Sequence, residues 1–381
     1  MKFLALGGTD YVGASSYYVE LDGTRLLLDC GKGICRSRSQ VFSPAFASLL
    51  TGGCLQSLGQ LDGILLSHAH FDHIAAIDEI THAAPDTPVF ATRLTKELAD
   101  HLLFDRSFYW ESDDILSDFK QKFAVSEAID RIQQVGYHQT FCIGSVNVTF
   151  FEAGHVPGGA AIYLQSESEE GSVLYTGDYM LDRTILTPGL QLPDWVKPDV
   201  VILNGLHAKH PTYRPKRTLL PILHTVQDHA ASGTPLHIQV HQLTKGVELV
   251  ALFKQAGIFV PIFLDDAIYS LAQRMSYAGV PILTQNCQRL PPFGSTDGIV
   301  LSSRKMYRMP HIKADFSLHG TFWDDLTLLT RLQPQVVYLV HAPNSAVAEI
   351  DSLQNHFAQT NIICPKQGQL YTNSMRNEEH L

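Results

Sequence analysis

Blocks of hydrophobic and polar positions follow one another along the chain, and they predict an α/β protein. SYYVEL (16–21) and TRLLLDC (24–30) read as a hairpin, with Asp22 and Gly23 as its tight turn. LDGILL (61–66) is a short apolar run typical of a buried strand, and residues 92–134 are charged and largely helical by pattern. Further strands are predicted over 147–151, 160–164, 173–176 and 200–203.

From residue 219 the pattern changes to a regular alternation of helices and strands. The predicted order is helix 219–233, strand 236–240, helix 245–257, strand 259–264, helix 267–279 and strand 280–283. Such βαβ alternation indicates a small parallel sheet. Candidate ligand residues lie on both sides of it, so we interpret it as an insertion. The predicted domains are 1–205, an inserted cap 206–298, and a return to the first domain over 299–381.

Composition indicates a globular, non-membrane chain. With 381 residues, 45% hydrophobic and 17% charged, two domains are the natural expectation. No apolar stretch reaches the 18 or so residues of a membrane span, and MKFLALGGTD reads as a first strand rather than a secretion signal. The six cysteines show no C-x-x-C spacing, which favours a reducing compartment and a cytoplasmic location.

The motif H-x-H-x-D-H at 68–73 is the strongest chemical signal in the sequence. It supplies His68, His70, Asp72 and His73 at the end of a predicted strand, just before a predicted amphipathic helix. Side chains so closely spaced on a turn can converge on one point, and imidazole with carboxylate suits zinc and related metals. A solvated histidine-rich turn is the alternative.

Three later strands also end in a residue of ligand type. VNVTFFEAGH ends at His155, VLYTGD at Asp178 and VVYLVH at His341. Ligands at the ends of strands held by a buried sheet are what a preorganised site requires. These positions therefore supply the further ligands that a two-metal site needs.

Several motifs together resemble the metallo-β-lactamase superfamily and, within it, the β-CASP branch of nucleic-acid hydrolases. They run over nearly the whole chain. The resemblance implies an αββα sandwich with an inserted small α/β, β-CASP-like cap domain. The matching stretches are LGGTDYVGASSYYVELDGTRLLLDCG (6–31, with Asp29 as the first acidic motif), HAHFDH, AGHVPGGA, YTGD, SSRKMYR (302–308), FSLHGTFWDDL (316–326) and YLVHAP (338–343).

The resemblance also implies two zinc ions and assigns their ligands. Three residues would bind one ion, three the other, and one would bridge both. These groups are His68, His70 and His155; Asp72, His73 and His341; and Asp178.

The implied chemistry is phosphodiester hydrolysis by a hydroxide that the two zinc ions activate. Asp72, His319 and Asn204 are the candidate catalytic residues, with His319 as general acid for the leaving 3′ oxygen. The family carries an acid where this chain has Asn204. We expect the amide to accept a hydrogen bond and hold His319, without the charge that would raise the pKa of that histidine.

A nucleic-acid substrate is expected, although the net charge of −10 argues against a uniformly basic surface. The branches that act on RNA carry histidine at the position of His341, which favours single-stranded RNA. The family often dimerises, so a homodimer is possible. Two locally basic stretches, 207–217 and 303–313, offer phosphate contacts: Lys209, Arg214, Arg304 and Lys305.

Three other functions stay open. A DNA nuclease would use the same chemistry. A small-molecule phosphodiesterase or thioesterase is suggested by the insert, which is short for the family. A non-catalytic partner subunit is suggested by Asn204.

Overall fold

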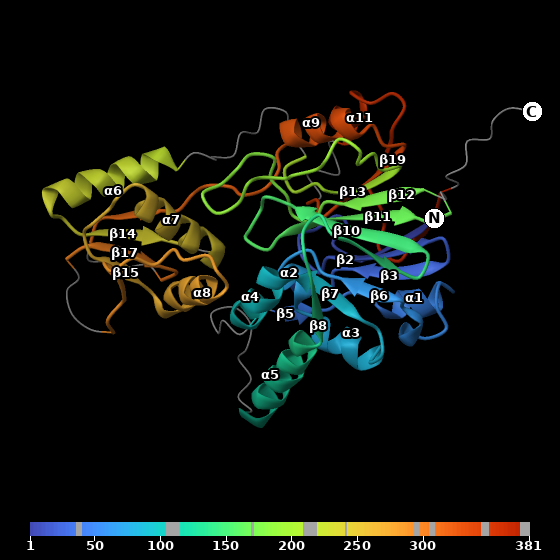
Figure 1. The fold of residues 1–381 in the computed structure, drawn as a ribbon, viewed down its shortest axis with the longest axis horizontal. Helices are drawn as coiled ribbons and strands as arrows, with labels where there is room; N and C mark the ends of the chain where they lie inside the picture. The colour runs from blue at the N-terminus through green and yellow to red at the C-terminus, as the bar shows by residue number, and fades with distance from the viewer. Residues whose placement is uncertain are drawn as a thin grey trace, which may run out of the picture. The chain divides into compact units, whose positions relative to one another are not determined.

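The computed structural model forms two compact units (Figure 1), each considered by itself below. Unit 1 comprises Met1–Arg183, Pro188–Arg214 and His319–Leu381, and unit 2 comprises Thr184–Thr187 and Pro215–Leu318. The structure describes residues 1–35, 40–103, 115–168, 171–208, 219–240, 242–292, 297–304, 309–343 and 350–373.

The first sheet of unit 1 has seven strands and contains the predicted hairpin. Asp22 and Gly23 have φ of +51° and +75°, the left-handed geometry that a tight hairpin turn requires, and antiparallel pairing of the flanking strands confirms the hairpin. The sheet order is β21 (Leu370–Thr372), β1 (Lys2–Gly7), β2 (Ser16–Leu21), β3 (Thr24–Leu28), β6 (Gly63–Leu65), β7 (Val89–Thr92) and β8 (Ile132–Val135).

The second sheet of unit 1 also has seven strands and contains the four strands predicted between residues 147 and 203. Its order is β20 (Asn361–Ile363), β19 (Val336–Val340), β13 (Val200–Asn204), β12 (Ser172–Tyr175), β11 (Ala160–Ser166), β10 (Val146–Glu152) and β9 (Thr140–Ile143). A short hairpin of β4 (Gly33–Cys35) and β5 (Gln40–Phe42) lies outside both sheets.

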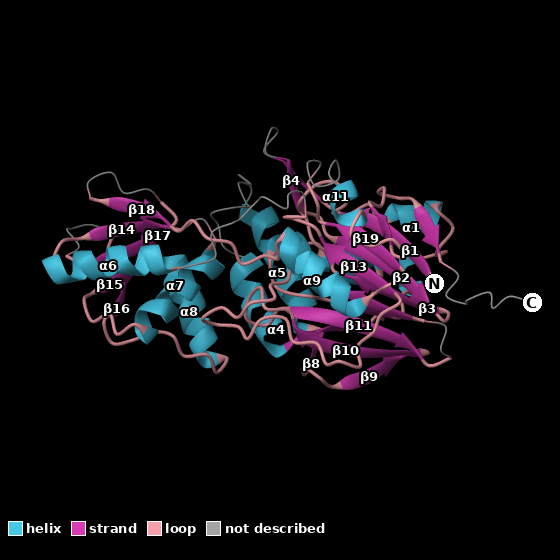
Figure 2. Cartoon of the chain, turned by 90° about the horizontal axis from the view of Figure 1, so that it is seen from above, coloured by secondary structure: helices cyan, strands magenta, loops and turns pink. Residues whose placement is uncertain are grey.

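The alternation of side chains along these strands builds a sandwich. In β13, Val200 and Ile202 belong to the core between the two sheets, whereas Val201 and Leu203 face the outer layer with α9 and α11. Helices therefore cover both outer faces (Figures 1 and 2), which confirms the predicted αββα architecture. The helices of unit 1 are α1 (Ala47–Thr51), α2 (Phe71–Ile74), α3 (Ile77–Ala83), α4 (Arg93–Leu103), α5 (Ile115–Asp130), α9 (Phe322–Leu332) and α11 (Ile350–Gln354), with a 3-10 turn at Leu58–Gln60.

Unit 2 is a five-stranded sheet in which every pairing is parallel. The strand order is β16 (Cys287–Arg289), β15 (Ile262–Leu264), β17 (Ile299–Ser302), β14 (Leu236–Gln239) and β18 (His311–Lys313). The three predicted helices are present as α6 (Leu220–Ser232), α7 (Leu243–Gln255) and α8 (Asp266–Tyr277).

Two predictions for this region differ from the structure. The strand expected over 280–283 is wrong; those residues are irregular, and β16 follows at Cys287–Arg289. The return to unit 1 comes at His319 rather than at residue 299. The reason is that β17 pairs with β14 and β15, and β18 pairs with β14, so both strands belong to the sheet of unit 2.

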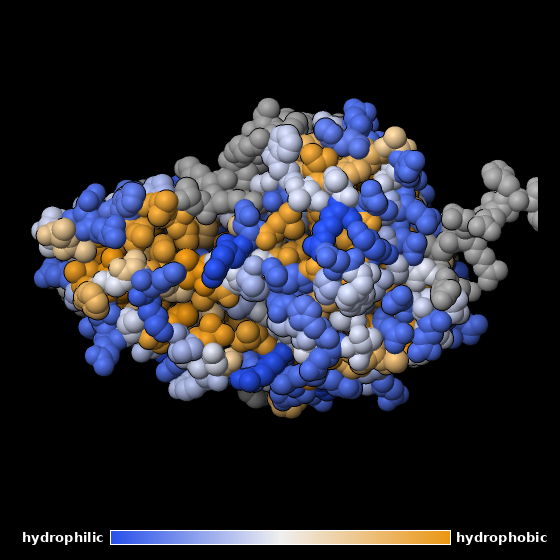
Figure 3. Space-filling model, turned by 45° about the horizontal axis from the view of Figure 1, so that its top comes forward, coloured by the Kyte–Doolittle hydropathy of each residue, from blue (hydrophilic) through white to orange (hydrophobic). Residues whose placement is uncertain are grey.

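The surface of unit 2 retains large apolar side chains. Phe259, Tyr277 and Leu220 are all more than half exposed, and Figure 3 shows orange areas over unit 2 on the face drawn. A small domain cannot cover all its apolar residues, because its surface is large relative to its volume. Within the described part of the chain, no helix combines the length and hydrophobicity of a membrane span.

Glu248 on α7 is the most consequential buried charge of unit 2. Its carboxylate accepts a hydrogen bond from the backbone N–H of Ile185, in the short segment Thr184–Thr187. Burial raises the pKa of Glu248 above its usual 4.5, although hydrogen bonds from Ile185 and Thr184 oppose this rise. Ionisation of Glu248 at neutral pH therefore opposes folding.

We expect the thermal unfolding midpoint of the wild-type chain to fall, relative to Glu248→Gln, as pH rises from 4 to 7. A raised folded-state pKa gives stability that is complete below the unfolded value near 4.5 and is lost as pH rises through the folded value. Midpoints of the full-length chain across this range measure the effect. Glu167→Gln, at an exposed position, is the matched control. Parallel profiles for wild type and Glu248→Gln would contradict the expectation.

Candidate metal centre

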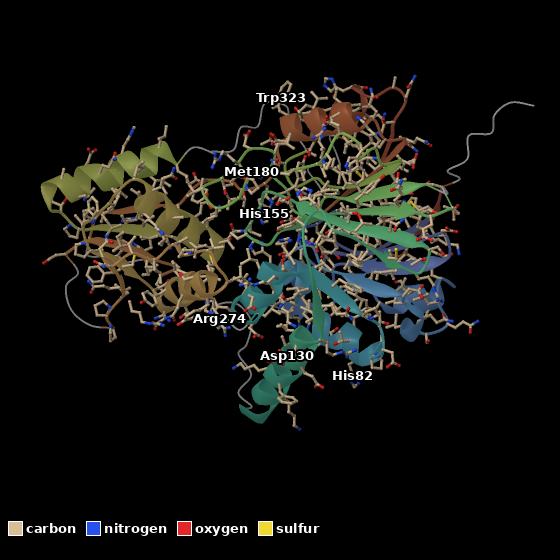
Figure 4. All side chains as sticks on the ribbon, viewed as in Figure 1. His82, Asp130, His155, Met180, Arg274 and Trp323 are labelled. Carbon is tan, nitrogen blue, oxygen red and sulfur yellow. The ribbon has the colours of Figure 1, made fainter. Side chains whose placement is uncertain are left out.

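The candidate ligands converge because their strands run in one direction. β10 is antiparallel to β11, which is antiparallel to β12, and β12, β13 and β19 are mutually parallel. The carboxyl ends of β10, β12, β13 and β19 therefore lie at one edge of the second sheet. His155, Asp178 and His341 each follow one of these strands, and Figure 4 shows His155 and Met180 close together at this edge.

The seven predicted ligands form two adjacent groups. The ligand atoms within each group all lie within 4.8 Å of one another. One group contains the first two histidines of the motif, and the other contains its aspartate and third histidine. The first group consists of His68, His70, His155 and Asp178. The second consists of Asp72, His73 and His341.

Asp178 connects the two groups through its two carboxylate oxygens. Oδ1 lies 3.2 Å from Nε2 of His73, and Oδ2 lies 3.8 Å from Nε2 of His68 and 3.6 Å from Nε2 of His155. Asp178 is 97% buried in a setting dominated by imidazoles. The carboxylate therefore lies between the two groups, and its bridging of two ions stays a prediction of the family resemblance.

Hydrogen bonds at the outer ring nitrogens leave the inner ones free to bind. The Ser67 hydroxyl donates to Asp29 at 2.7 Å, so it must accept the bond from Nδ1 of His68 at 3.0 Å. Nδ1 of His73 lies 2.7 Å from Asp29, and Nδ1 of His341 lies 2.9 Å from the Ser15 hydroxyl. Such outer partners fix the ring orientation of metal-binding histidines.

The inner nitrogens fit a metal. Nε2 of His68 and of His73 are buried and, among the described residues, have no hydrogen-bond partner. Two further ring nitrogens, Nε2 of His155 and Nδ1 of His70, face each other at 3.2 Å. A buried nitrogen without a partner is costly, and ring nitrogens gathered this closely are typical ligands of a cation. The arrangement therefore defines a metal-binding site.

The pKa shifts of the ligand histidines also favour binding of a cation. Burial, followed by repulsion from His155, lowers the pKa of His70 to about 3. Burial also lowers the pKa of His68. For His73 the burial effect is outweighed by Asp178 and Asp29, which raise its pKa. His68 and His70 therefore keep a lone pair, and a cation that binds would displace the proton favoured on His73.

The backbone next to the motif turn is packed too tightly for any side chain. The Cys30 and Lys32 N–H groups donate to carbonyls of the motif turn at 2.9 and 3.2 Å. Between them, a Cβ on Gly31 would lie 1.7 Å from the carbonyl oxygen of Asp72. Asp29 itself has φ of +59°, a conformation that few residues other than glycine adopt. Gly31 therefore sets the distance between this loop and the metal ligands.

His319 lies beside the metal groups at the start of the final segment of unit 1. Its Nδ1 is 3.5 Å from Oδ2 of Asp178, and its ring centroid is 4.3 Å from that of His155. The next residue, Gly320, donates its N–H to the Tyr179 carbonyl at 2.6 Å, which ties the segment to the loop carrying Asp178. Burial, with repulsion from His155, lowers the pKa of His319.

Asn204 ends β13 and donates a hydrogen bond from Nδ2 to Asp178. The sequence analysis expected this amide to accept a bond and hold His319, so the contact with Asp178 is an unforeseen feature. Of the predicted phosphate-binding residues, Arg304 is exposed on unit 2. Lys209, Arg214 and Lys305 lie outside the described residues.

Sequence reasoning missed the residues that support the ligands. Ser67 directly precedes the motif, which is a local signal, but Ser15 and Gly31 carry none because their contacts are distant in the chain. His207 was treated only as part of a basic stretch, yet its ring lies edge-on to His319 with centroids 6.0 Å apart.

Comparisons with known proteins show one matching domain and several related nucleases. Residues 18–201 match the metallo-beta-lactamase superfamily domain. The chain is 27% identical to probable RNase MJ4 of Methanocaldococcus jannaschii, covering 72% of this chain and 61% of that protein. It is 25% identical to ribonuclease TTHA0252 of Thermus thermophilus, with 70% and 58% covered. It is 24% identical to Integrator complex subunit 11 of Danio rerio, with 82% and 51% covered.

A solved structure shares the fold. It is the crystal structure of a protein of unknown function from Enterococcus faecalis V583, with a TM-score of 0.66, 12% identity, and 97% and 99% of the two chains covered. Residues 18–201 thus contain a metallo-β-lactamase superfamily domain, and the relatives of the chain include RNA-processing nucleases of the β-CASP branch. The chain spans between 51% and 61% of the length of the three curated relatives named above.

Gly31→Ala should disrupt metal binding, because its Cβ would overlap the backbone that carries Asp72 and His73. We expect a loss of bound metal of at least about tenfold, together with a lower unfolding midpoint. Metal analysis after dialysis against a limiting chelator measures the loss. Gly59→Ala, at an exposed position with an ordinary φ and open space, should leave both quantities unchanged. Wild-type metal content in Gly31→Ala would contradict the role assigned to this glycine.

Proposed function

We propose that the chain is a ribonuclease: a hydrolase that cleaves phosphodiester bonds in single-stranded RNA and carries two zinc ions. The observation that carries the proposal is the position of Asp178 between two groups of ligands. Paired sites of this kind are typical of enzymes that act on phosphate esters. The names of the relatives, which include ribonucleases, support RNA as the substrate.

The seven ligand residues would hold the two zinc ions, and the chemistry these would supply when bound is Lewis acidity, which makes hydroxide available at neutral pH. Asp72 is the most accessible ligand of its group, with 30% of its side chain exposed. Its free carboxylate oxygen can accept a hydrogen bond from the attacking water and orient it toward phosphorus. Asp72 therefore has both a binding and a catalytic part in the proposal.

His319 is the proposed general acid. Its side chain is 14% exposed and adjoins Asp178, at the border between the ligand groups and solvent. Its lowered pKa makes the imidazolium scarce at neutral pH in the empty site. A bound phosphodiester carries a negative charge, which favours the imidazolium. The proton donor is thus formed when substrate binds.

Contacts to the substrate backbone, the cellular location and the oligomeric state are proposed as well. Arg304, which is exposed, offers a guanidinium to the phosphate backbone, and Lys209, Arg214 and Lys305 are proposed as phosphate contacts from the charge of their sequence stretches alone. The six cysteines, all within the described residues, form no disulfide, which supports a cytoplasmic location. A homodimer is proposed from the family resemblance.

The purified chain should contain two zinc ions and cleave end-labelled single-stranded RNA. The double variant His68→Ala, Asp72→Ala removes one ligand from each group, so we expect it to lose the metal and at least about 10³-fold in kcat/KM. Metal analysis and a cleavage assay on the same preparation measure both. His224→Ala, at an exposed histidine of α6, should behave as wild type.

Two outcomes would overturn this assignment. Undiminished cleavage by the fully chelated chain would remove the metal from the mechanism. Faster turnover of a matched DNA oligomer, or of bis(p-nitrophenyl) phosphate without any oligomer cleavage, would replace RNA as the substrate.

His319→Gln tests the general acid separately. Removing the proton donor should lower kcat by about 10²–10⁴-fold, while the metal content stays at the wild-type level because His319 is not one of the seven ligands. Single-turnover cleavage and metal analysis give the two values, and His224→Gln is the control. A kcat within about twofold of wild type would show that another group protonates the leaving oxygen.

A further inference from the structure

Two hydrogen bonds determine which way the side-chain amide of Asn204 faces. Its Oδ1 accepts the backbone N–H of Leu206 at 3.0 Å. Because a backbone N–H can only donate, the atom facing it must be the amide oxygen. The NH₂ group therefore faces Asp178, and Asn204 donates to Oδ1 of that carboxylate.

The backbone of Asn204 is also held in place, by hydrogen bonds and by strand pairing. Its N–H donates to the Thr176 hydroxyl at 3.1 Å, and that hydroxyl donates in turn to the Gly177 carbonyl at 2.8 Å. On the other side, Asn204 is in register with Val340, one residue before His341. The amide thus stands between the loop that carries Asp178 and the strand that carries His341.

The oxygen that Asn204 contacts is the one directed at His73. Oδ1 of Asp178 lies 3.2 Å from Nε2 of His73, whereas Oδ2 faces the other ligand group. Rotation of the Asp178 carboxylate would move both oxygens away from their groups. A donor fixed on Oδ1 prevents that rotation.

We infer that Asn204 is a positioning residue, whose amide donor holds Asp178 in the orientation in which its two oxygens face the two ligand groups. A carboxylate at 204 could still accept the Leu206 N–H. It could not donate to Asp178, and it would place two carboxylates in contact, which is unfavourable without a shared proton. The asparagine is therefore matched to its partner and is not merely the remnant of a lost acid.

A double-mutant cycle in the chelated chain tests the pairing without metal or substrate. Asn204→Asp should lower the unfolding midpoint of the full-length chain by about 5 °C when Asp178 is present. In the Asp178→Asn background the donor and acceptor are exchanged, so the same substitution should cause little loss or a gain. Equal losses in the two backgrounds would overturn the inference.

Asn361→Asp is the matched control for this cycle. It introduces the same charge at an exposed position at the start of β20. It should have the same small effect in both backgrounds. A background-dependent effect there would show that the cycle reports net charge, and would remove the support that the cycle gives.

Zinc affinity provides a second test of the same inference. Asn204→Ala removes the donor without adding charge, and we expect zinc to bind about 10–100-fold more weakly in a chelator competition. Asn286→Ala removes an amide that donates to the Ile258 and Val260 carbonyls in unit 2, and zinc affinity should be unchanged. Wild-type affinity in Asn204→Ala would overturn the positioning role.

The consequence for catalysis rests on the proposed function, but neither test requires RNA or turnover. If the chain fails to cleave RNA while the cycle shows coupling, the function is wrong and the positioning role stands. If RNA is cleaved and no coupling is found, the proposed function stands and the positioning role is wrong.

Discussion

The site depends on holding one carboxylate, Asp178, among imidazoles that repel each other when charged. Burial alone would raise the pKa of this carboxyl, yet His73 and His341 keep it ionised. Burial, followed by repulsion from neighbouring histidines, lowers the pKa of His68 and of His70. Such a cluster opposes folding unless its geometry is imposed from outside and a cation neutralises it. The two sheets impose the geometry, because strand ends cannot move without breaking the ladders that hold them.

Asp29 links that framework to the ligands. It follows β3 and accepts hydrogen bonds from the Ser67 backbone and hydroxyl, from Tyr175, and from His73. Tyr175 ends β12 in the second sheet, so a single buried carboxylate joins both halves of the sandwich at the metal turn. A buried carboxylate with this many donors is held in one orientation. The result is a ligand turn whose position is set by the packing of the core as a whole.

The ligands were predictable from sequence because each is marked locally, whereas their supports are not. A hydrophobic strand that stops at a histidine or aspartate is visible at His155, Asp178 and His341. Nothing near Ser15 indicates a bond to a residue more than 300 positions away. The same limit explains unit 2, where short strands of three or four residues gave misplaced boundaries: β18 has the polar sequence His-Ile-Lys, and only pairing with β14 identifies it as a strand.

The family resemblance was informative, but at Asn204 it directed attention only to a missing charge. It assigned Asn204 by comparison with an acid, so the asparagine looked like a loss of charge next to His319. In the structure the amide serves Asp178, and its donor hydrogens are the property that matters. When one residue in a coupled site is replaced, the new side chain can contact a different neighbour, and the strength of the contact changes too. A departure from a family pattern is therefore better interpreted through the hydrogen bonds it makes possible than through the charge it removes.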